Sequence, residues 1–212
     1  MTDLLRQEIA TLADLIVVKV GTRVLTHDDG RLNEDRVERL AEELHELALT
    51  GRRVVLVSSG AVGAGIGRLG LPGRPRDLAQ LQAVAAIGQS HLIEVYDRCL
   101  RKYGRHAAQL LLTAEDLNHR TRYLNVRNTL LALMEFGAIP IINENDTVAV
   151  EELQTTFGDN DRLAALVTNL LRAPLMILLS DVEGLYDRDP KDPQAQVIPT
   201  VSDLNGDVMA LV

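Results

Sequence analysis

The sequence contains no tryptophan, and aromatic residues make up only 3% of its 212 residues. This scarcity disfavours base-stacking platforms and aromatic cages, and it requires a core built from aliphatic side chains. The single cysteine, Cys99, excludes an intrachain disulfide framework and favours a reducing compartment. We therefore expect a cytoplasmic protein.

Long hydrophobic runs are also missing. No apolar stretch approaches the roughly 20 residues that a membrane-spanning helix needs, and residues 1–15 contain acids where a secretory signal would have a basic start and an apolar core. The net charge is −8 and the basic residues are scattered, which argues against a nucleic-acid-binding face. We therefore expect no membrane or nucleic-acid partner. The five histidines show no pair at metal-ligand spacing, so we also expect no zinc site.

Five short apolar runs predict the strands of a sheet. None of them alternates cleanly, as expected for strands that are covered on both faces. The predicted strands are Leu15–Val20, Arg53–Ser58, Ala107–Leu112, Ala138–Ile142 and Leu175–Ser180. Helical patterns lie between them, at Asn33–Thr50, Arg76–Lys102, Arg122–Phe136 and Asp161–Leu171. This alternation predicts an α/β fold with a mainly parallel sheet, in which ligands bind at the carboxyl ends of the strands.

Lys19 lies inside the first predicted strand, among apolar residues. Burying an unpaired ammonium is costly, so this side chain should reach a water-filled or anion-filled site at the strand end. Gly21 follows and allows a ligand to approach the backbone closely. A lysine that merely extends from the strand end into solvent explains this segment equally well.

The second predicted strand is followed by "SSGAVGAG", residues 58–65, which brings small residues to the start of a helix. Backbone N–H groups in such a turn bind phosphate or carboxylate. The segment "GIGRLG", residues 65–70, satisfies G-x-G-x-x-G, but it begins seven residues after the strand and lacks the later acid of a dinucleotide site. No P-loop pattern occurs, so a nucleotide would have to be held in another way.

Acid and amide residues cluster near the ends of three apolar elements. The clusters are Asn143–Asp146, Gly158–Asp161 and the acid Asp181. Such residues usually cap turns. Three clusters are more than turn capping requires, and together they favour a ligand site.

These segments, in this order, resemble the amino acid kinase family. The resemblance covers nearly the whole chain and includes "IVVKVGTRVLT", "VVLVSSGAVGAG", "AAIGQS", "INENDTV", "GDND" and "LLSDVEGLYDRDP". Within the family, "INENDTV" followed by "GDND" is closest to the branch that phosphorylates the γ-carboxylate of glutamate in proline biosynthesis. The resemblance implies a three-layer αβα sandwich, ATP and Mg²⁺ as cofactors, and L-glutamate as substrate.

The resemblance also assigns roles to individual residues. Lys19 would contact the transferring phosphate and Asp161 would organise the catalytic lysines or the metal. The residues expected to bind glutamate are Ser59, Gly60, Asp146 and Asn160. The residues expected to bind the nucleotide are Lys19, Gly21, Ser180 and Asp181. No residue is expected to be a dedicated metal ligand.

The family continues past the last residue of this chain with a glycine-rich segment that carries a second lysine, and often with a PUA domain. We therefore expect residues 1–212 to form a partial kinase domain, without a PUA domain, that keeps the glutamate pocket but catalyses poorly. The resemblance further implies feedback inhibition by proline and assembly into a homodimer or homotetramer.

Two other functions stay open at this point. The chain could belong to a related kinase that acts on acetylglutamate or uridylate, or it could be a binding module that senses glutamate or proline without chemistry. Asp146 discriminates against the first, because an N-acylated substrate has no ammonium to pair with a carboxylate. A plain α/β domain whose polar clusters are turn caps would not explain the ordered motifs.

Overall fold

The computed structural model describes residues 2–148, 159–202 and 206 of the chain. Its centre is a five-stranded sheet with the order β3-β4-β2-β1-β5, and every pairing between neighbouring strands is parallel. The strands are β1 (Leu15–Val20), β2 (Arg53–Ser58), β3 (Ala107–Leu112), β4 (Ile139–Glu144) and β5 (Leu175–Leu179). The predicted parallel α/β fold is confirmed, and the first three strands have the predicted bounds.

Two strands differ in their bounds from the prediction. β4 begins one residue later, at Ile139, and continues to Glu144, because Asn143 and Glu144 keep pairing with Leu111 and Leu112 of β3. β5 ends at Leu179, so that Ser180 lies beyond the strand. The amide of Asn143 is therefore a buried part of the sheet rather than a turn cap.

Eight helices occur in the described part of the chain. They are α1 (Thr2–Leu12), α2 (Thr22–Leu25), α3 (Glu34–Leu49), α4 (Ala61–Leu69), α5 (Leu78–Arg101), α6 (Ala114–Asn118), α7 (Arg120–Glu135) and α9 (Asp159–Leu171). α3 has the predicted cap, since the side chain of Asn33 accepts a hydrogen bond from the backbone N–H of Arg36. The helix predicted at Asp161–Leu171 begins two residues earlier than expected, because α9 starts at Asp159 and an acid is favourable in a first helical turn.

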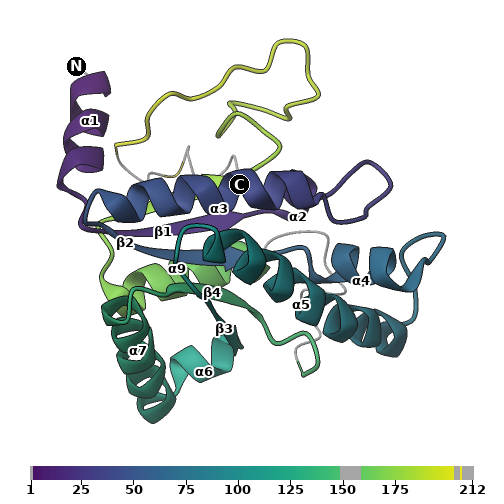
Figure 1. Ribbon diagram of the computed structural model, residues 1–212. Helices are drawn as coiled ribbons and strands as arrows, with labels where there is room; N and C mark the ends of the chain where they lie inside the picture. Colours follow the sequence, from purple (N-terminus) through teal and green to yellow (C-terminus); the bar gives the residue numbers. More distant parts are fainter. Residues whose placement is uncertain (1, 149–158, 203–205, 207–212) are drawn as a thin grey trace.

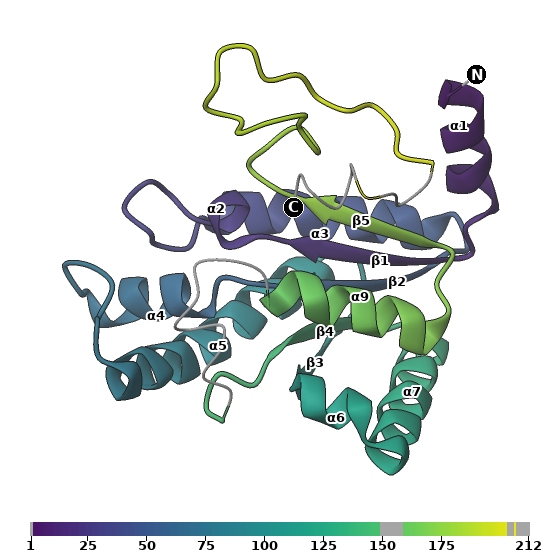
Figure 2. The same cartoon turned by 180° about the vertical axis from the view of Figure 1, so that it is seen from behind.

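The helices cover the sheet on both faces, which gives three layers (Figures 1 and 2). On one face, Ile16, Val18 and Val20 of β1 pack in one apolar cluster with buried residues of α3 and α5. On the other face, Leu15 and Val17 pack in a second cluster with buried residues of α6, α7 and α9. The alternate residues of β1 thus face opposite layers, which explains why the sequence of this strand is continuously apolar.

α4 and α5 cross in direct backbone contact. A Cβ atom placed on Gly88 would lie 1.8 Å from the carbonyl oxygen of Ala61, and one placed on Gly65 would lie 2.0 Å from that of Val84. Both positions therefore require glycine. The segment "GIGRLG" begins inside this crossing, and its first glycine is buried against α5.

We expect Gly88→Ala to lower the free energy of unfolding by about 2–3 kcal/mol, because the added methyl group must push two backbones apart. Gly67→Ala is the matched control on α4. Its Cβ would meet only Arg31 at 3.8 Å, and alanine favours helix. Urea unfolding measures both variants. Equal stability of Gly88→Ala and the parent would contradict the close crossing.

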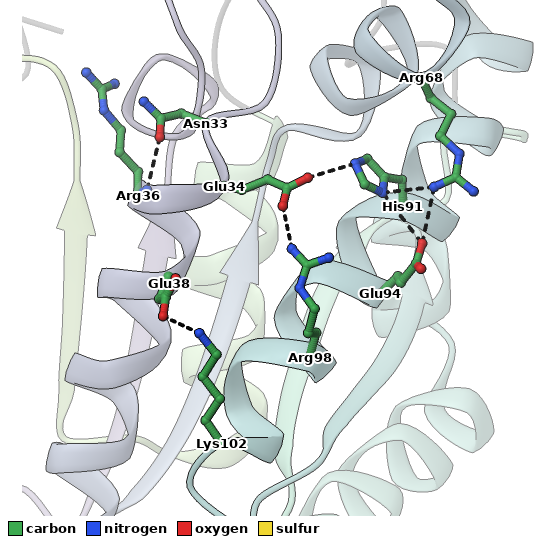
Figure 3. A network of polar contacts seen from close by, with 9 residues as sticks. All are labelled: Asn33, Glu34, Arg36, Glu38, Arg68, His91, Glu94, Arg98 and Lys102. Atoms are coloured by element: carbon green, nitrogen blue, oxygen red, sulfur yellow. Dashed lines mark hydrogen bonds and ion pairs between the residues drawn. The ribbon is translucent and has the colours of Figure 1, made fainter.

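A surface network of charged side chains links α3, α4 and α5 (Figure 3). Glu34 of α3 pairs with Arg98 and His91 of α5, and Arg68 of α4 contacts His91 at 3.1 Å and Glu94 at 3.2 Å. Exposed ion pairs contribute roughly 0–1 kcal/mol each. Their effect here is to favour one register between three helices rather than to supply the stability of the core.

Candidate active site

The carboxyl ends of β1, β2 and β5 meet at one edge of the sheet. Val20 and Ser58 are register partners, so that the segments after β1 and β2 start side by side. The backbone N–H of Ser59 donates to the carbonyl of Val20 at 3.1 Å. The N–H of Gly21 donates to the carbonyl of Leu179 at 3.1 Å. This edge is where the predicted residues at positions 19, 21, 59, 60, 180 and 181 come together.

Lys19 turns its ammonium toward the start of α9. Its Nζ lies 2.7 Å from Oδ1 of Asp161, and its side chain is only 12% exposed, whereas that of Asp161 is 50% exposed. A Cβ atom on Gly21 would lie 3.4 Å from this ammonium, so that the glycine leaves room directly beside it. The alternative of a lysine that extends into solvent is therefore wrong, and the two residues predicted to be catalytic form one ion pair.

A chain of buried polar side chains runs from Ser59 into the protein. Nδ2 of Asn160 donates to Oγ of Ser59 at 2.9 Å and to Oδ1 of Asn143 at 3.0 Å. Nδ2 of Asn143 donates in turn to Oε1 of Gln89 at 2.8 Å. All four residues are buried. Since buried polar groups are retained only where they are hydrogen-bonded, this network holds the Ser59 loop, β4, α5 and α9 in a fixed relation.

Gly60 forms the turn between β2 and α4. Its φ of +107° lies in the left-handed region, where a side chain would be strained, and it precedes the first residue of α4. The helix therefore directs its N-terminal amides toward the same edge of the sheet. This confirms that a helix follows "SSG" as predicted.

Asp146 lies in the turn after β4 and is partly buried. Burial raises the pKa of its carboxyl group to about 6, although the positive charge of Arg74 opposes this rise. Asp146 and Gln89 line a common hollow of about 20 Å³. That volume is enough for one water molecule, so the described walls alone do not enclose an amino acid.

Ser180 and Asp181 follow β5 and line a hollow of about 860 Å³ together with Arg23, Arg36 and Arg39. Nη1 of Arg23 lies 2.8 Å from Oδ2 of Asp181, and this guanidinium holds the pKa of Asp181 below its usual range. Arg36 holds the end of α2, since its Nη1 donates to three backbone carbonyls there. The hollow is large enough for a nucleotide-sized ligand.

The predicted residues thus fall into two groups. Lys19, Ser59, Asn160 and Asp161 are connected by direct contacts or by successive positions, and Asp146 adjoins them through the hollow that it shares with Gln89. The pair at positions 180 and 181 follows β5, whose Leu179 pairs with Val20 and accepts a hydrogen bond from the N–H of Gly21. Gly158, of the predicted cluster Gly158–Asp161, lies outside the described residues.

Sequence reasoning missed three contributors. Asn143 was recognised as part of a cluster but not as the centre of a buried network, and Gln89 and Arg23 received no role. "AAIGQS" was among the motifs, yet a glutamine in an amphipathic helix gives no signal of a buried partner.

In the described ranges, no three His, Cys, Asp or Glu side chains gather as a metal site, and no helix is long and apolar enough to cross a membrane.

A three-layer fold with an acid-paired strand-end lysine beside a glycine turn is what the amino acid kinase family would supply. The sequence profile of that family matches residues 14–206, and the chain belongs to the amino acid kinase family.

Among its relatives, a glutamate 5-kinase of Rhodopirellula baltica is 57% identical over 208 residues, which are 98% of this chain and 54% of that protein. A glutamate 5-kinase of Caldanaerobacter subterraneus is 51% identical over 197 residues, 92% of this chain and 52% of the relative. One of Geobacter metallireducens is 51% identical over 190 residues, 89% of this chain and 50% of the relative. The chain therefore spans about half the length of the curated relatives that it matches.

Proposed function

We propose that this chain contributes the glutamate-binding part of an enzyme that uses ATP to phosphorylate the γ-carboxylate of L-glutamate, giving L-glutamyl 5-phosphate in the first step of proline biosynthesis. The observation that carries the proposal is the ion pair of Lys19 and Asp161 next to the Ser59–Asn160 hydrogen bond. The names of the relatives support the same reaction.

The chemistry asks little of the protein beyond position and charge. A γ-carboxylate has an ordinary pKa of about 4.3, so that it is an ionised nucleophile at neutral pH and needs no general base. The bound nucleotide supplies the phosphoryl group. Lys19 would neutralise charge on the phosphoryl oxygens, and Asp161 would hold its ammonium in place. The first amides of α4, after Gly60, would add backbone donors.

Asp146 explains why the substrate would be a free amino acid. A carboxylate beside a pocket that attracts anions needs a positive partner, and the α-ammonium of glutamate is one. Acetylglutamate and uridylate lack this group. Since Asp146 is partly buried, a pair with it would be only weakly screened by solvent.

Ser180 and Asp181 are proposed to meet the base and ribose of ATP, with Gly21 and Lys19 near its phosphates. The hollow beside Arg23 supports this assignment by its size. No cluster of metal ligands occurs in the described part of the chain, so Mg²⁺ would be held mainly by the phosphates, as is common for this ion.

Further parts of the proposal concern the whole protein. Proline also carries an α-ammonium that Asp146 could pair with, which supports feedback inhibition at the same pocket. We also propose assembly into a homodimer or homotetramer, in whose interface Phe136, 85% exposed at the end of α7, would be buried. Burial raises the pKa of the Cys99 thiol and keeps it unreactive, in keeping with a cytoplasmic location.

We propose that residues 1–212 combine the glutamate-binding part of the kinase domain with the beginning of its nucleotide-binding part.

Calorimetric titration of the purified chain tests the substrate. We expect L-glutamate to bind and N-acetyl-L-glutamate to bind at least about tenfold more weakly, because acetylation removes the charge that pairs with Asp146. Uridylate is the second comparison ligand. Equal or tighter binding of acetylglutamate would contradict the assignment, and glutamate binding without any phosphate transfer would favour a binding module.

A further inference from the structure

The direction of every hydrogen bond in the Ser59 network follows from one backbone group. The N–H of Glu144 can only donate, and it lies 2.9 Å from a side-chain atom of Asn143, which must therefore be the oxygen Oδ1. The other end of this amide is then its nitrogen. It donates to Oε1 of Gln89 at 2.8 Å.

The same reasoning continues to Ser59. Oδ1 of Asn143 also lies 3.0 Å from a side-chain atom of Asn160. Because Oδ1 can only accept, this atom of Asn160 must be the donor nitrogen, Nδ2. The second hydrogen of that nitrogen points to Oγ of Ser59 at 2.9 Å. Oγ accepts in this contact, and a hydroxyl has one hydrogen of its own to donate. Within the described part of the chain nothing accepts this hydrogen, which leaves it for a bound ligand.

We propose that Gln89 is a positioning residue of the glutamate pocket: by holding Asn143 from α5, it fixes the amide of Asn160 and leaves the hydroxyl hydrogen of Ser59 to donate to a carboxylate of the substrate. This inference rests on the proposed function and adds to it a residue that acts through others. The N–H of Glu144 sets the direction of the hydrogen bonds, and Gln89 holds the amide of Asn143 in that orientation by accepting from its nitrogen. A carboxylate is the ligand group that this arrangement suits.

The position of Gln89 is itself fixed by packing. The neighbouring residue, Gly88, lies against the backbone of α4, and a Cβ atom there would come within 2.3 Å of the backbone nitrogen of Gly65. α5 therefore cannot shift along this contact. Gln89 is 7% exposed and Asn143 is 2% exposed, so that loss of the glutamine oxygen leaves a buried N–H group of Asn143 without its acceptor.

Two substitutions of similar size separate the oxygen from the bulk of the side chain. Gln89→Met removes the acceptor, and we expect it to weaken L-glutamate binding about tenfold in calorimetry. Gln89→Glu keeps an oxygen at the same place, in either protonation state, and should restore binding to within about threefold of the parent. The control is Gln80→Met, an exposed residue of the same helix, which should bind like the parent.

Val95→Ala measures the effect of lost stability alone. Val95 is a fully buried residue of α5 that has no place in the network, so this variant should melt earlier yet bind glutamate like the parent. Gln89→Met with unchanged affinity would overturn the proposal. Affinity that falls in Val95→Ala as much as in Gln89→Met would also overturn it.

A ligand-free measurement keeps this inference separate from the substrate assignment. Exchange of the side-chain amide hydrogens of Asn143 and Asn160, followed by NMR, should be slow in the parent and at least about tenfold faster in Gln89→Met. If the parent chain binds no glutamate but shows this difference, the network stands and the proposed function fails. If the exchange rates are equal in both, Gln89 holds nothing and the inference fails.

Discussion

Lys19→Met should reduce phosphoryl transfer to glutamate about 10³-fold while leaving the dissociation constant for glutamate within about threefold of the parent. The thioether keeps most of the length and bulk of the lysine side chain and removes its charge. The affected quantity is kcat, because the ammonium would act on charge that develops on the phosphoryl oxygens and not on the amino acid.

The geometry supports this separation. The ammonium lies 2.7 Å from Asp161 and beside Gly21, whereas the hydrogen-bond network from Ser59 to Gln89 does not include Lys19. Removing the charge leaves Asp161 without this partner, but its side chain is 50% exposed and stays hydrated. We therefore expect little loss of stability.

The rate is measured by trapping the acyl phosphate with hydroxylamine, which detects product even when turnover is slow. The control is Lys102→Met, which removes a half-exposed lysine that is paired with Glu38 of α3. Turnover by Lys19→Met within about tenfold of the parent would mean that this ammonium does not reach the phosphoryl group. An equally large loss in Lys102→Met would point to general destabilisation.

The sequence sufficed to predict the elements of the fold because their signals are local. The apolar run of Leu15–Val20 is covered on both faces, and Asn33 is followed by acids at the start of an amphipathic pattern; each feature predicts its element without reference to the rest of the chain. β4 was predicted to end too early, because Asn143 and Glu144 are polar. Only their pairing with β3 and the burial of the Asn143 amide keep them in the strand.

The site was predictable where one residue type is unusual in its surroundings. A lysine in an apolar strand predicted a site at the strand end, and the structure pairs it with Asp161 from a helix 142 positions later in the chain. The partner itself came from family resemblance, because nothing local to Asp161 indicates it. The role of Gln89 could not be predicted in either way, since it depends on which atom of a distant amide faces it.

Asp146→Asn should weaken L-glutamate binding at least about 100-fold and at the same time make the free chain more stable above pH 6. The first effect follows from the loss of the partner of the α-ammonium. The second follows from burial, because the parent must keep a carboxylate partly removed from water, whereas the amide of asparagine carries no charge.

The sign of the pH dependence follows from the raised pKa. Folding raises the pKa of Asp146 from an ordinary 3.8 to about 6, so that the folded chain binds this proton more tightly than the unfolded chain does. The associated stability is present below pH 4 and is lost as the pH rises through 6. Asp146→Asn has no carboxylate at this position and does not lose this stability. Its free energy of unfolding should exceed that of the parent by about 1–2 kcal/mol at pH 8 and should equal it near pH 4, as measured by urea unfolding at both pH values.

The affinity for glutamate should depend on the same titration of Asp146, but it should rise with pH where the stability falls. Only the ionised carboxylate pairs with the ammonium, so the affinity of the parent should fall about tenfold between pH 7 and pH 5. Asp146→Asn should bind weakly at both values. Glu135→Gln is the control, because it removes an exposed acid at the opposite edge of the sheet. A parent affinity that does not change over this range would mean that Asp146 is not the partner of the ammonium. A residue that costs stability at neutral pH is hard to explain by the fold alone, and this cost is itself an argument that Asp146 is there for a ligand.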